Sequence, residues 1–599
     1  MADAKATMSP TRTSKLVLRI LAVPLVLVSL ACGPDRTAGG GSAGEGGPSP
    51  AAGESADGAP WLVDATQDWN VHFTHDAGAG GDLLFPEMMG GGVAVFDPDE
   101  DGDLDLFFVS GGPGLRRPPG PGDAVNGLFL QGDDGRFTDA TATSGLAGRG
   151  YGTGVAVGDF DNDGHVDVFL ANIGADRLFR GRGDGTFEDV TRRAGLPGGG
   201  SPDVDPDRNW SSSAAFCDID RDGHLDLYVV GYVHFDRAVE CTDRAGRREY
   251  CGPASFEDRV DTLLHNQGDG TFRDITHEAG IDEVTGAGLG VVCEDFDGDG
   301  WVDIYVANDG DPNQLWMNQR NRTFVDDALI MGTSVNAAGL AEAGMGVVAA
   351  DFDNDADFDL FLTHLREESN TFYRNLGTGI GFEDHTAHSG LGTGSAPYTG
   401  FGTTPADIDL DGDLDVVIVN GRVTRGERLT DALPEPWNDY AEPNLVYRND
   451  GDRFRLLERE ARPFTEPVEV GRGLATGDLD GDGDLDLVVS NIESPARLYR
   501  GEPPPGRWLL VDVFDPRLRR RALGARVRVD ADGRRQVRTI QGAMSYLSSS
   551  DPRAHFGFGP GDGGRVEAIV VRWPDGVEET FPGTAMNQAI VLRRGEGSP

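Results

Sequence analysis

Residues 478–486 read Asp-Leu-Asp-Gly-Asp-Gly-Asp-Leu-Asp, and this nine-residue pattern decides the predicted fold. It places carboxylates at positions 1, 3, 5, 7 and 9 and a glycine at position 6. Closely similar motifs begin at Asp97, Asp159, Asp218, Asp295, Asp351 and Asp407. A pattern that recurs in this way indicates a chain built from one repeated structural unit.

The spacing of the motif suits calcium. Calcium takes six to eight oxygen ligands at about 2.3–2.6 Å, and carboxylates at positions 1, 3 and 5 of a tight loop can converge on one ion. Position 7 contributes its backbone carbonyl, so its side chain varies between Asp, His and Trp, and the Asp at position 9 completes the shell. Glycine at position 6 permits a left-handed turn. Ala356 occupies that position in the fifth motif, which predicts a strained loop and a weaker site.

Up to seven calcium ions are therefore expected, one in each motif. The predicted ligands are Asp97, Asp99, Asp101, Asp103 and Asp105; Asp159, Asp161, Asp163, His165 and Asp167; Asp218, Asp220, Asp222, His224 and Asp226; Asp295, Asp297, Asp299, Trp301 and Asp303; Asp351, Asp353, Asp355, Asp357 and Asp359; Asp407, Asp409, Asp411, Asp413 and Asp415; and Asp478, Asp480, Asp482, Asp484 and Asp486.

Two other interpretations of the motif are weaker. An EF-hand also begins with D-x-D-x-D-G, but it needs Glu at position 12 and flanking helices. Position 12 here is Phe108, Leu170 or Val306 in three of the motifs, and the flanking runs are β-like. Asp-rich turns that bind nothing would explain one motif. They do not explain seven with the same phase, in which unneutralised carboxylates would repel one another.

A second pattern follows each motif and completes the unit. It is clearest at residues 176–191, where two short apolar runs flank a Gly-Asp-Gly turn, the signal of a hairpin. Each unit then holds about four strands, the content of one propeller blade. The prediction is an all-β fold, a seven-bladed β-propeller closed into a ring. The last unit lacks its fourth strand, and residues 62–66 are predicted to supply it.

Residues 61–500 resemble the FG-GAP/VCBS propeller of α-integrins and their bacterial relatives. That resemblance implies that the calcium loops line one face of the propeller and that ligands often dock on the opposite face or on the rim. The pieces 523–527, 541–547, 555–559 and 571–576 resemble the ASPIC/UnbV domain, in that order. One departure is Ser548-Ser-Ser550, where the family pattern usually has Ser-Gln. The whole chain resembles a bacterial member of the cartilage acidic protein family.

This small C-terminal β-domain is locally rich in arginine, with alternating runs that predict strands with one polar face. The arginine face could dock on the acidic propeller or bind an acidic polysaccharide. Docking is the simpler prediction.

The N-terminus is typical of an exported chain. A basic start precedes an apolar run, residues 20–31, that is too short and too broken to span a membrane. Leu30-Ala31-Cys32 resembles the bacterial lipoprotein signal, although Ser29 stands where an aliphatic residue is usual. Cys32 is the predicted lipidation site. An ordinary signal peptide with an incidental cysteine is the alternative. We expect an extracytoplasmic protein anchored to a membrane by lipid, or a secreted one if Cys32 is not lipidated.

The expected domains are a signal peptide at 1–31, the lipidated cysteine and a flexible tether at 32–58, the propeller at 59–504 and the ASPIC/UnbV domain at 505–599. Cys241 and Cys251 are a plausible disulfide in an oxidising compartment. Cys217 and Cys293 are expected to be buried, small apolar residues.

Composition narrows the function. With 100 Asp and Glu against 52 Lys and Arg, the chain lacks the positive charge that a nucleic-acid partner needs. No H-E-x-x-H or P-loop motif is present, the G-x-S-x-G match at residues 40–44 falls in the glycine-rich stretch predicted to be a tether, and no catalytic residue is assigned. His72 and His75 are expected in a solvated turn, and His555 is expected to make a structural hydrogen bond.

A calcium-binding surface module for adhesion to a glycan or an extracellular protein is favoured over an enzyme, although catalysis stays open. The alternative is a calcium-dependent enzyme that acts on a polysaccharide or a secondary metabolite, with its site at the junction of the propeller and the C-terminal domain.

Overall fold

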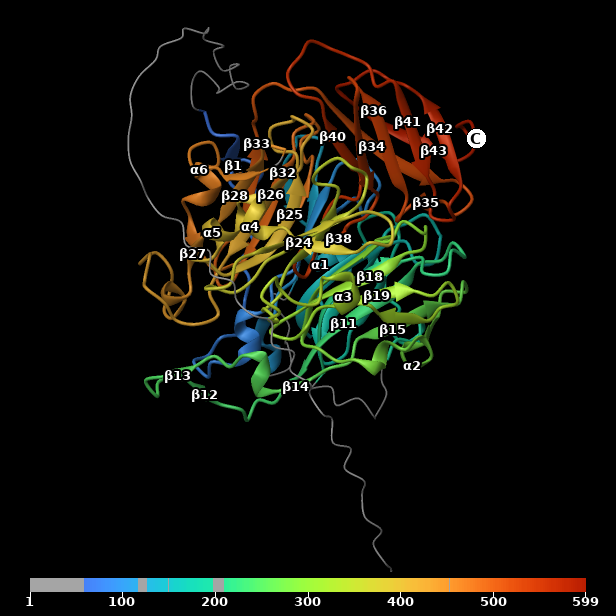
Figure 1. The fold of residues 1–599 in the computed structure, drawn as a ribbon. Coiled ribbons are helices and arrows are strands. Elements are labelled where there is room, and N and C mark those ends of the chain that lie inside the picture. The colour runs from blue at the N-terminus through green and yellow to red at the C-terminus, as the bar shows by residue number, and fades with distance from the viewer. Residues whose placement is uncertain (1–58, 117–125, 149, 198–208, 452) are drawn as a thin grey trace, which may run out of the picture. The chain divides into compact units, whose positions relative to one another are not determined.

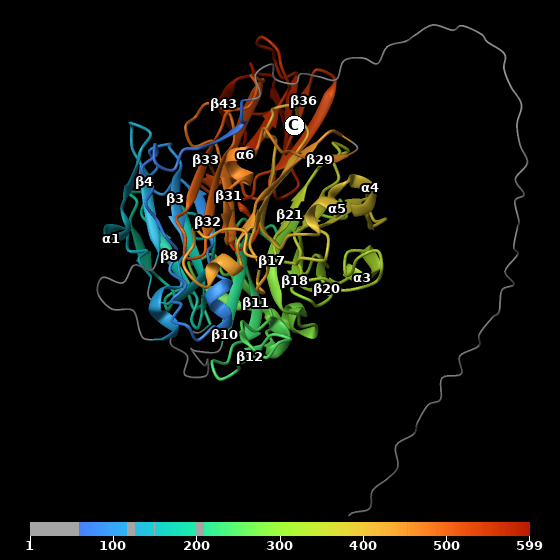
Figure 2. The ribbon, with the colours of Figure 1, turned by 90° about the vertical axis from the view of Figure 1, so that its left-hand side faces the viewer.

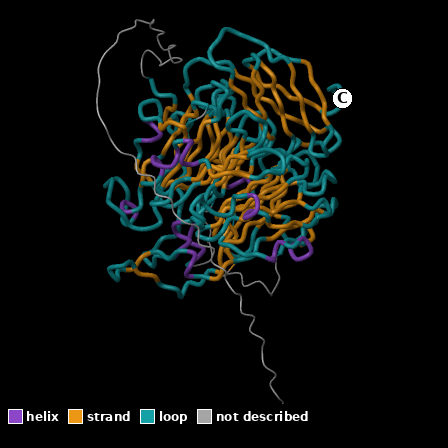
Figure 3. Tube along the Cα trace, viewed as in Figure 1, coloured by secondary structure: helices purple, strands orange, loops and turns teal. Residues whose placement is uncertain are grey.

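The computed structural model describes residues 59–116, 126–148, 150–197, 209–451 and 453–599. Strands dominate it, and its helices are single turns (Figure 3). The all-β prediction is confirmed. The expected signal peptide, Cys32 and tether lie outside the described residues. No helix in the described part of the chain is long and apolar enough to cross a membrane.

Seven groups of four antiparallel strands, each called a sheet below, follow one another along the chain. A single bridge between Trp210 and Ile173 joins the second and third groups. The first holds β2 (Val93–Phe96), β3 (Asp105–Phe108), β4 (Gly127–Gln131) and β5 (Phe137–Asp139). The second holds β6 (Tyr151–Gly158), β7 (Asp167–Ile173), β8 (Arg177–Gly181) and β9 (Phe187–Asp189). The third holds β10 (Asn209–Cys217), β11 (Asp226–His234), β15 (Thr262–Asn266) and β16 (Phe272–Asp274). The fourth holds β17 (Gly288–Glu294), β18 (Asp303–Asn308), β19 (Gln314–Asn318) and β20 (Phe324–Asp326).

The remaining three sheets have the same order. The fifth holds β21 (Val347–Ala350), β22 (Asp359–Leu362), β23 (Thr371–Asn375) and β24 (Phe382–Asp384). The sixth holds β25 (Gly400–Ala406), β26 (Asp415–Asn420), β28 (Leu445–Asn449) and β29 (Phe454–Leu456). The seventh holds β31 (Gly471–Gly477), β32 (Asp486–Asn491), β33 (Arg497–Gly501) and, as its fourth strand, β1 (Leu62–Asp64).

The first strands of the sheets contact one another in a cycle. β2 lies beside β6, β6 beside β10, and so on through β17, β21, β25 and β31, which returns to β2. β1 pairs with β33, with Leu62 opposite Gly501, so a strand from the start of the chain completes the last sheet. This closure was predicted and is confirmed. Such a ring leaves no exposed inner edge.

Apolar side chains between neighbouring sheets hold the ring together. Ala94 and Phe107 of the first sheet form one buried cluster with Val155 and Val168 of the second. β26 has the sequence Asp-Val-Val-Ile-Val-Asn and is buried along its whole length. A strand covered on both faces needs such a continuous apolar run.

Short helices and further strands connect the sheets. They are η1 (Phe85–Met88), η2 (Gly112–Leu115), α1 (Thr141–Ser144), η3 (Pro253–Ser255), α2 (Thr276–Ala279), η4 (Ile281–Glu283), α3 (Ala328–Met331), α4 (Thr386–Ser389), α5 (Leu391–Ser395), η5 (Trp437–Asp439), α6 (Arg462–Thr465), β12 (Cys241–Thr242), β13 (Arg248–Glu249), β14 (Glu257–Asp258), β27 (Glu442–Pro443) and β30 (Val468–Glu469).

The C-terminal strands form two sheets around a separate apolar core. One sheet holds β34 (Trp508–Asp515), β35 (Arg520–Arg521), β40 (Ala554–Gly557) and β43 (Gln588–Arg593). The other holds β36 (Arg526–Ala531), β37 (Arg534–Thr539), β41 (Ala568–Arg572) and β42 (Glu578–Pro582). These strands gather at one end of the described part of the chain, and β12 lies at the other (Figures 1 and 2).

One segment of the C-terminal region enters the ring. β38 (Ala543–Met544) and β39 (Ser548–Ser549) pair with each other, and β39 continues the first sheet beside β2. Between them, the hydroxyl of Tyr546 donates to the carbonyl of Met89 at 2.5 Å. Residues 543–550 reach the first strand of all seven sheets through hydrogen bonds or close packing. We call residues 543–550 the hub segment.

Candidate metal loops

Each acidic motif forms the turn between the first and second strands of a sheet. All seven loops share one hydrogen-bond skeleton. The position-1 carboxylate accepts from the backbone N–H of position 6, as Asp478 does from Gly483 at 3.2 Å. The position-5 carboxylate accepts from the N–H of position 7, as Asp482 does from Asp484 at 3.0 Å. These bonds curl the loop so that its carboxylates turn inward.

The position-9 aspartate fastens the loop to the sheet. In the seventh loop, Asp486 accepts from the N–H of Leu479 at 2.7 Å and from that of Gly501, in the third strand, at 2.9 Å. Asp486 is fully buried. In the first loop position 2 is Pro98, which has no N–H, and Oδ2 of Asp105 is buried without a hydrogen-bond partner in the described part of the chain.

Position 6 has left-handed backbone geometry in every loop, with φ between 77 and 104°. Ala356 adopts φ of 77° in the fifth loop, so an alanine occupies a conformation that favours glycine. The predicted strain is therefore present in the structure.

In the second, third, fourth and sixth loops the position-7 side chain contacts position 4 of the preceding loop. His165 contacts Glu100, and His224 lies 3.1 Å from the side-chain amide of Asn162. Trp301 stacks under the guanidinium of Arg221. These contacts link adjacent loops.

The residues present fit a hard cation. Six of the seven loops contain at least one buried carboxylate oxygen that has no hydrogen-bond partner among the described residues. These oxygens belong to Asp97, Asp99, Asp105, Asp161, Asp295, Asp351, Asp353, Asp407, Asp409 and Asp478. An unpartnered buried carboxylate is costly, and a bound cation would remove that cost. Three-residue groups whose ligand atoms lie within 4.8 Å of one another recur in these loops.

The electrostatics point the same way. Burial raises the pKa of Asp97, Asp159, Asp218 and Asp478 to about 6 and that of Asp351 to about 7. Burial raises the pKa of the position-9 residue Asp303 to about 8 and that of Asp105 to about 9. Loops that hold this many carboxylates need positive charge to keep them ionised.

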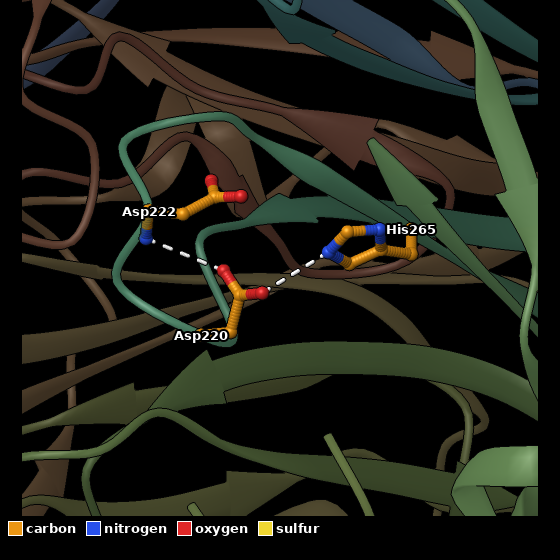
Figure 4. Close-up of side chains that lie close together, drawn as sticks. All are labelled: Asp220, Asp222 and His265. Atoms are coloured by element: carbon orange, nitrogen blue, oxygen red, sulfur yellow. Dashed lines mark hydrogen bonds and ion pairs between the residues drawn. The ribbon is translucent and has the colours of Figure 1, made fainter. Parts of the chain in front are cut away.

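The third loop differs from the other six. His265 of β15 points its Nε2 at Oδ2 of Asp220, 3.0 Å away, and Asp222 lies beside them (Figure 4). Although burial acts to raise the pKa of Asp220, the hydrogen bond from His265 and the charge of Arg322 outweigh it and lower the pKa. Sequence reasoning missed His265, because it lies 39 residues beyond the end of its motif, at Asp226.

The C-terminal sheets cover the loops. Arg520 donates to Oδ1 of Asn162 and to the carbonyl of Gly223, at 2.7 and 3.1 Å. Arg526 donates to Glu294 at 2.7 Å, and His555 Nε2 bonds the carbonyl of Gly483 at 2.8 Å. The predicted docking of the arginine-rich face onto the acidic propeller is confirmed, and His555 makes the expected structural hydrogen bond.

Two expectations about other residues were wrong. His75 is not in a solvated turn: it is buried, and neither ring nitrogen has a partner among the described residues. Cys217 and Cys293 are not free apolar residues. The structure joins them in a disulfide between β10 and β17, the first strands of adjacent sheets. Their 76-residue separation hides this proximity in the sequence. The structure also joins Cys241 to Cys251.

Comparison with known proteins agrees with this architecture. The FG-GAP-like repeat family matches residues 97–170, 159–229, 254–306, 295–362 and 351–418, and the ASPIC and UnbV family matches residues 515–599. Cartilage acidic protein 1 of Mus musculus is 29% identical over 532 residues, which cover 85% of this chain and 74% of the relative. The Homo sapiens protein is 28% identical, with 85% and 72% covered.

Solved structures give weaker likenesses. An Agrocybe aegerita lectin that recognises non-reducing terminal N-acetylglucosamine matches with a TM-score of 0.36 and 14% identity, over 68% of this chain and 86% of the lectin. A Bacillus licheniformis rhamnogalacturonan lyase matches with a TM-score of 0.35 and 15% identity, over 69% and 72%. Scores this low support no argument about ligands. The family models therefore identify FG-GAP-like repeats followed by an ASPIC and UnbV domain in this chain, which is similar over most of its length to proteins named cartilage acidic protein 1.

Proposed function

We propose that this chain is an exported calcium-binding protein whose propeller serves as a binding or adhesion module for a glycan or an extracellular protein. The observation that carries the proposal is the sevenfold loop with inward-turned carboxylates, whose buried oxygens are unpartnered in six copies. Up to seven calcium ions would bind, one in each loop, through the aspartates at positions 1, 3, 5 and 9 and the carbonyl at position 7.

Calcium in these loops would support the whole ring. The loops join the first and second strands of every sheet, contact their neighbours through positions 4 and 7, and lie against the C-terminal sheets. Neutralising their charge would remove repulsion from all these contacts at once. Calcium would thus make the ring more rigid, and surfaces away from the loops would recognise the ligand.

The face opposite the loops, together with the rim, is the proposed ligand surface, because the C-terminal sheets cover the loop face. The hairpin of β12 and β13 lies on that side and is tied by the disulfide between Cys241 and Cys251 (Figure 1). We propose that the protein is held at a membrane by lipid on Cys32, with residues 32–58 as a tether and the propeller at 59–504. It would be secreted if Cys32 is not lipidated.

A binding experiment tests this proposal. Glycan and extracellular-protein arrays are probed with the protein in millimolar calcium and in excess chelator. The proposal predicts saturable binding that requires calcium and survives changes on the loop face. Loss of binding on deletion of residues 241–251 would place the ligand on the hairpin side. Binding to no array member in either condition would contradict the proposal.

An enzymatic function is the second candidate, and one cavity favours it. A space of about 90 Å³ at the junction of the propeller and the C-terminal sheets is lined by Asp407, Arg538 and His555, among others. Nε2 of His555 bonds the carbonyl of Gly483. The other ring nitrogen, Nδ1, is buried and has no hydrogen-bond partner among the described residues. Turnover of a polysaccharide or a secondary metabolite that His555→Ala abolishes would replace the binding proposal with this one.

A further inference from the structure

The seven sheets carry different residues at one equivalent position near the metal loops. In each sheet, the position-9 aspartate accepts a hydrogen bond from a backbone N–H of the third strand. The residue just before that N–H belongs to the strand beside the loop carboxylates. In chain order these residues are Leu130, Arg180, His265, Met317, Arg374, Arg448 and Arg500.

Arginine is the commonest choice at this position, and it supplies positive charge to the loop. Arg180 pairs with Asp161 at 2.7 Å, and Arg448 pairs with Asp409 at 2.7 Å. Arg374 pairs with Asp353 in the same way. The third sheet replaces this permanent cation with an imidazole, a group that can bind a cation instead.

The imidazole of His265 is built into the fold rather than lying on the surface. Its side chain is 6% exposed. Nε2 lies 3.0 Å from Oδ2 of Asp220 and 4.0 Å from Oδ1 of Asp226. The ligand atoms of Asp220, Asp222 and His265 all lie within 4.8 Å of one another. In Figure 4 the ring projects from its strand toward the two carboxylates of the loop.

A second residue holds the ring in place. Nδ1 of His265 lies 2.7 Å from the side-chain amide of Gln267. In the structure the amide nitrogen of Gln267 faces Nδ1 and also donates to the carbonyl of His265 at 3.3 Å, so Nε2 carries the ring proton. Binding a metal at Nε2 would move that proton to Nδ1 and would require the amide to turn its oxygen toward the ring. Metal-binding histidines usually have such a partner on the other ring nitrogen.

We propose that the third loop, unlike the other six, is a site for a divalent transition metal of the zinc class, bound by His265 Nε2 together with the carboxylates of Asp220 and Asp222. Calcium prefers oxygen ligands, whereas zinc, nickel and copper accept imidazole readily. Two ligands of one tetrahedral ion with bonds of about 2.0–2.1 Å lie about 3.3 Å apart. Nε2 and Oδ2, which are 3.0 Å apart, would therefore separate by a few tenths of an ångström on binding. Water would complete the shell.

Arg322 is the group that such an ion would displace. Its Nε lies 2.5 Å from Oδ2 of Asp220, but it comes from the neighbouring sheet and its side chain is 46% exposed. An exposed ion pair contributes only about 0–1 kcal/mol, so releasing it costs little. The bound metal would keep the positive charge beside Asp220.

The test is zinc binding by the full chain in millimolar calcium, measured by titration calorimetry. The variant His265→Arg installs the residue that four sister sheets carry, so it is compatible with the fold, and an unchanged unfolding midpoint in calcium checks this. We expect one tight zinc site in the native chain and at least about a tenfold loss of affinity in His265→Arg.

Two controls, His224→Asp and His388→Ala, should keep the tight site. The first installs the position-7 residue of four other loops, and the second removes the exposed pair of His385 and His388 as a competing zinc site.

Each outcome decides the inference. It is overturned if the native chain binds no zinc in calcium, if His265→Arg binds zinc as tightly as the native chain, or if only His388→Ala loses the site. The inference rests on the loops being cation sites, as proposed above, and calcium is titrated separately to keep the two apart. Zinc bound through His265 in a chain that binds no calcium would contradict the proposed function and leave this inference standing. Calcium bound by every loop without zinc would do the reverse.

Discussion

Single residues set the backbone strain of each loop, and Ala356 shows this most simply. Its left-handed backbone, with φ of 77°, costs a non-glycine residue about 1–2 kcal/mol. We expect Ala356→Gly to raise the stability of the chain in calcium by about 1 kcal/mol and to tighten the weakest calcium site. Calcium titration and denaturant unfolding measure the two effects.

Gly102, at position 6 of the first loop, provides the matched control for Ala356. Its φ is 98°, and a Cβ added there would meet no atom within 4 Å. Gly102→Ala therefore introduces backbone strain without a clash, and it should lower stability by a similar amount. The strain explanation is wrong if both substitutions change stability in the same direction.

His75 should make stability depend on pH. Burial, together with the smaller effect of the charge of Arg472, lowers its pKa from 6.5 to about 3. The unfolded chain therefore takes up a proton near pH 6.5 while the folded chain stays neutral. Stability from this residue is complete above about pH 6.5 and is lost as the pH falls toward 3, by about 1.4 kcal/mol per unit.

The variant His75→Phe isolates this effect, because it keeps an aromatic ring at the position. Between pH 6.5 and pH 5, the unfolding free energy of the native chain should fall steadily relative to that of the variant. A pH-independent difference would show that His75 titrates alike in both states.

At the scale of strands and sheets, the disulfides are the clearest test. Cys217 and Cys293 connect the third and fourth sheets across 76 residues, and Cys241 and Cys251 close a span of 10. Because a longer closed loop restricts the unfolded chain more, the first bridge should contribute about 4 kcal/mol and the second about 3 kcal/mol. Double alanine variants of each pair, compared by denaturant unfolding after a free-thiol count, measure both. Free thiols at Cys217 and Cys293 in the oxidised native chain would refute the first bridge.

Patterns that are local in sequence were predicted well at this scale. The seven loops, the four strands of each unit and the closing strand at residues 62–64 all follow from short motifs and their repetition. Contacts that depend on the ring closing were not predicted. Cys217 meets Cys293, and position 7 meets position 4 of the preceding loop, only because adjacent sheets pack side by side. His265 was missed because it reaches the loop from the third strand of its own sheet, 39 residues beyond the motif.

At the scale of the whole molecule, the hub segment joins the C-terminal region to the ring. Tyr546 and Leu547 are buried among Met89, Phe401 and other core residues. Tyr546→Ala should destabilise the chain by about 3–5 kcal/mol, because it leaves a large cavity. Tyr546→Phe removes only the hydrogen bond to Met89 and should cost about 0.5–1.5 kcal/mol. Equal effects of the two variants would contradict a packing role.

The account depends most on calcium as the cation that the acidic loops bind. Thermal unfolding of the chain, in millimolar calcium and in excess chelator, tests this directly. A single site at one hundred times its Kd contributes about 2.7 kcal/mol, so several filled loops should raise the midpoint by many degrees. Magnesium at the same concentration should not reproduce the rise, because it demands a tighter, octahedral shell. An identical midpoint in calcium and in chelator would show that the aspartates are not calcium ligands and would contradict the central claim.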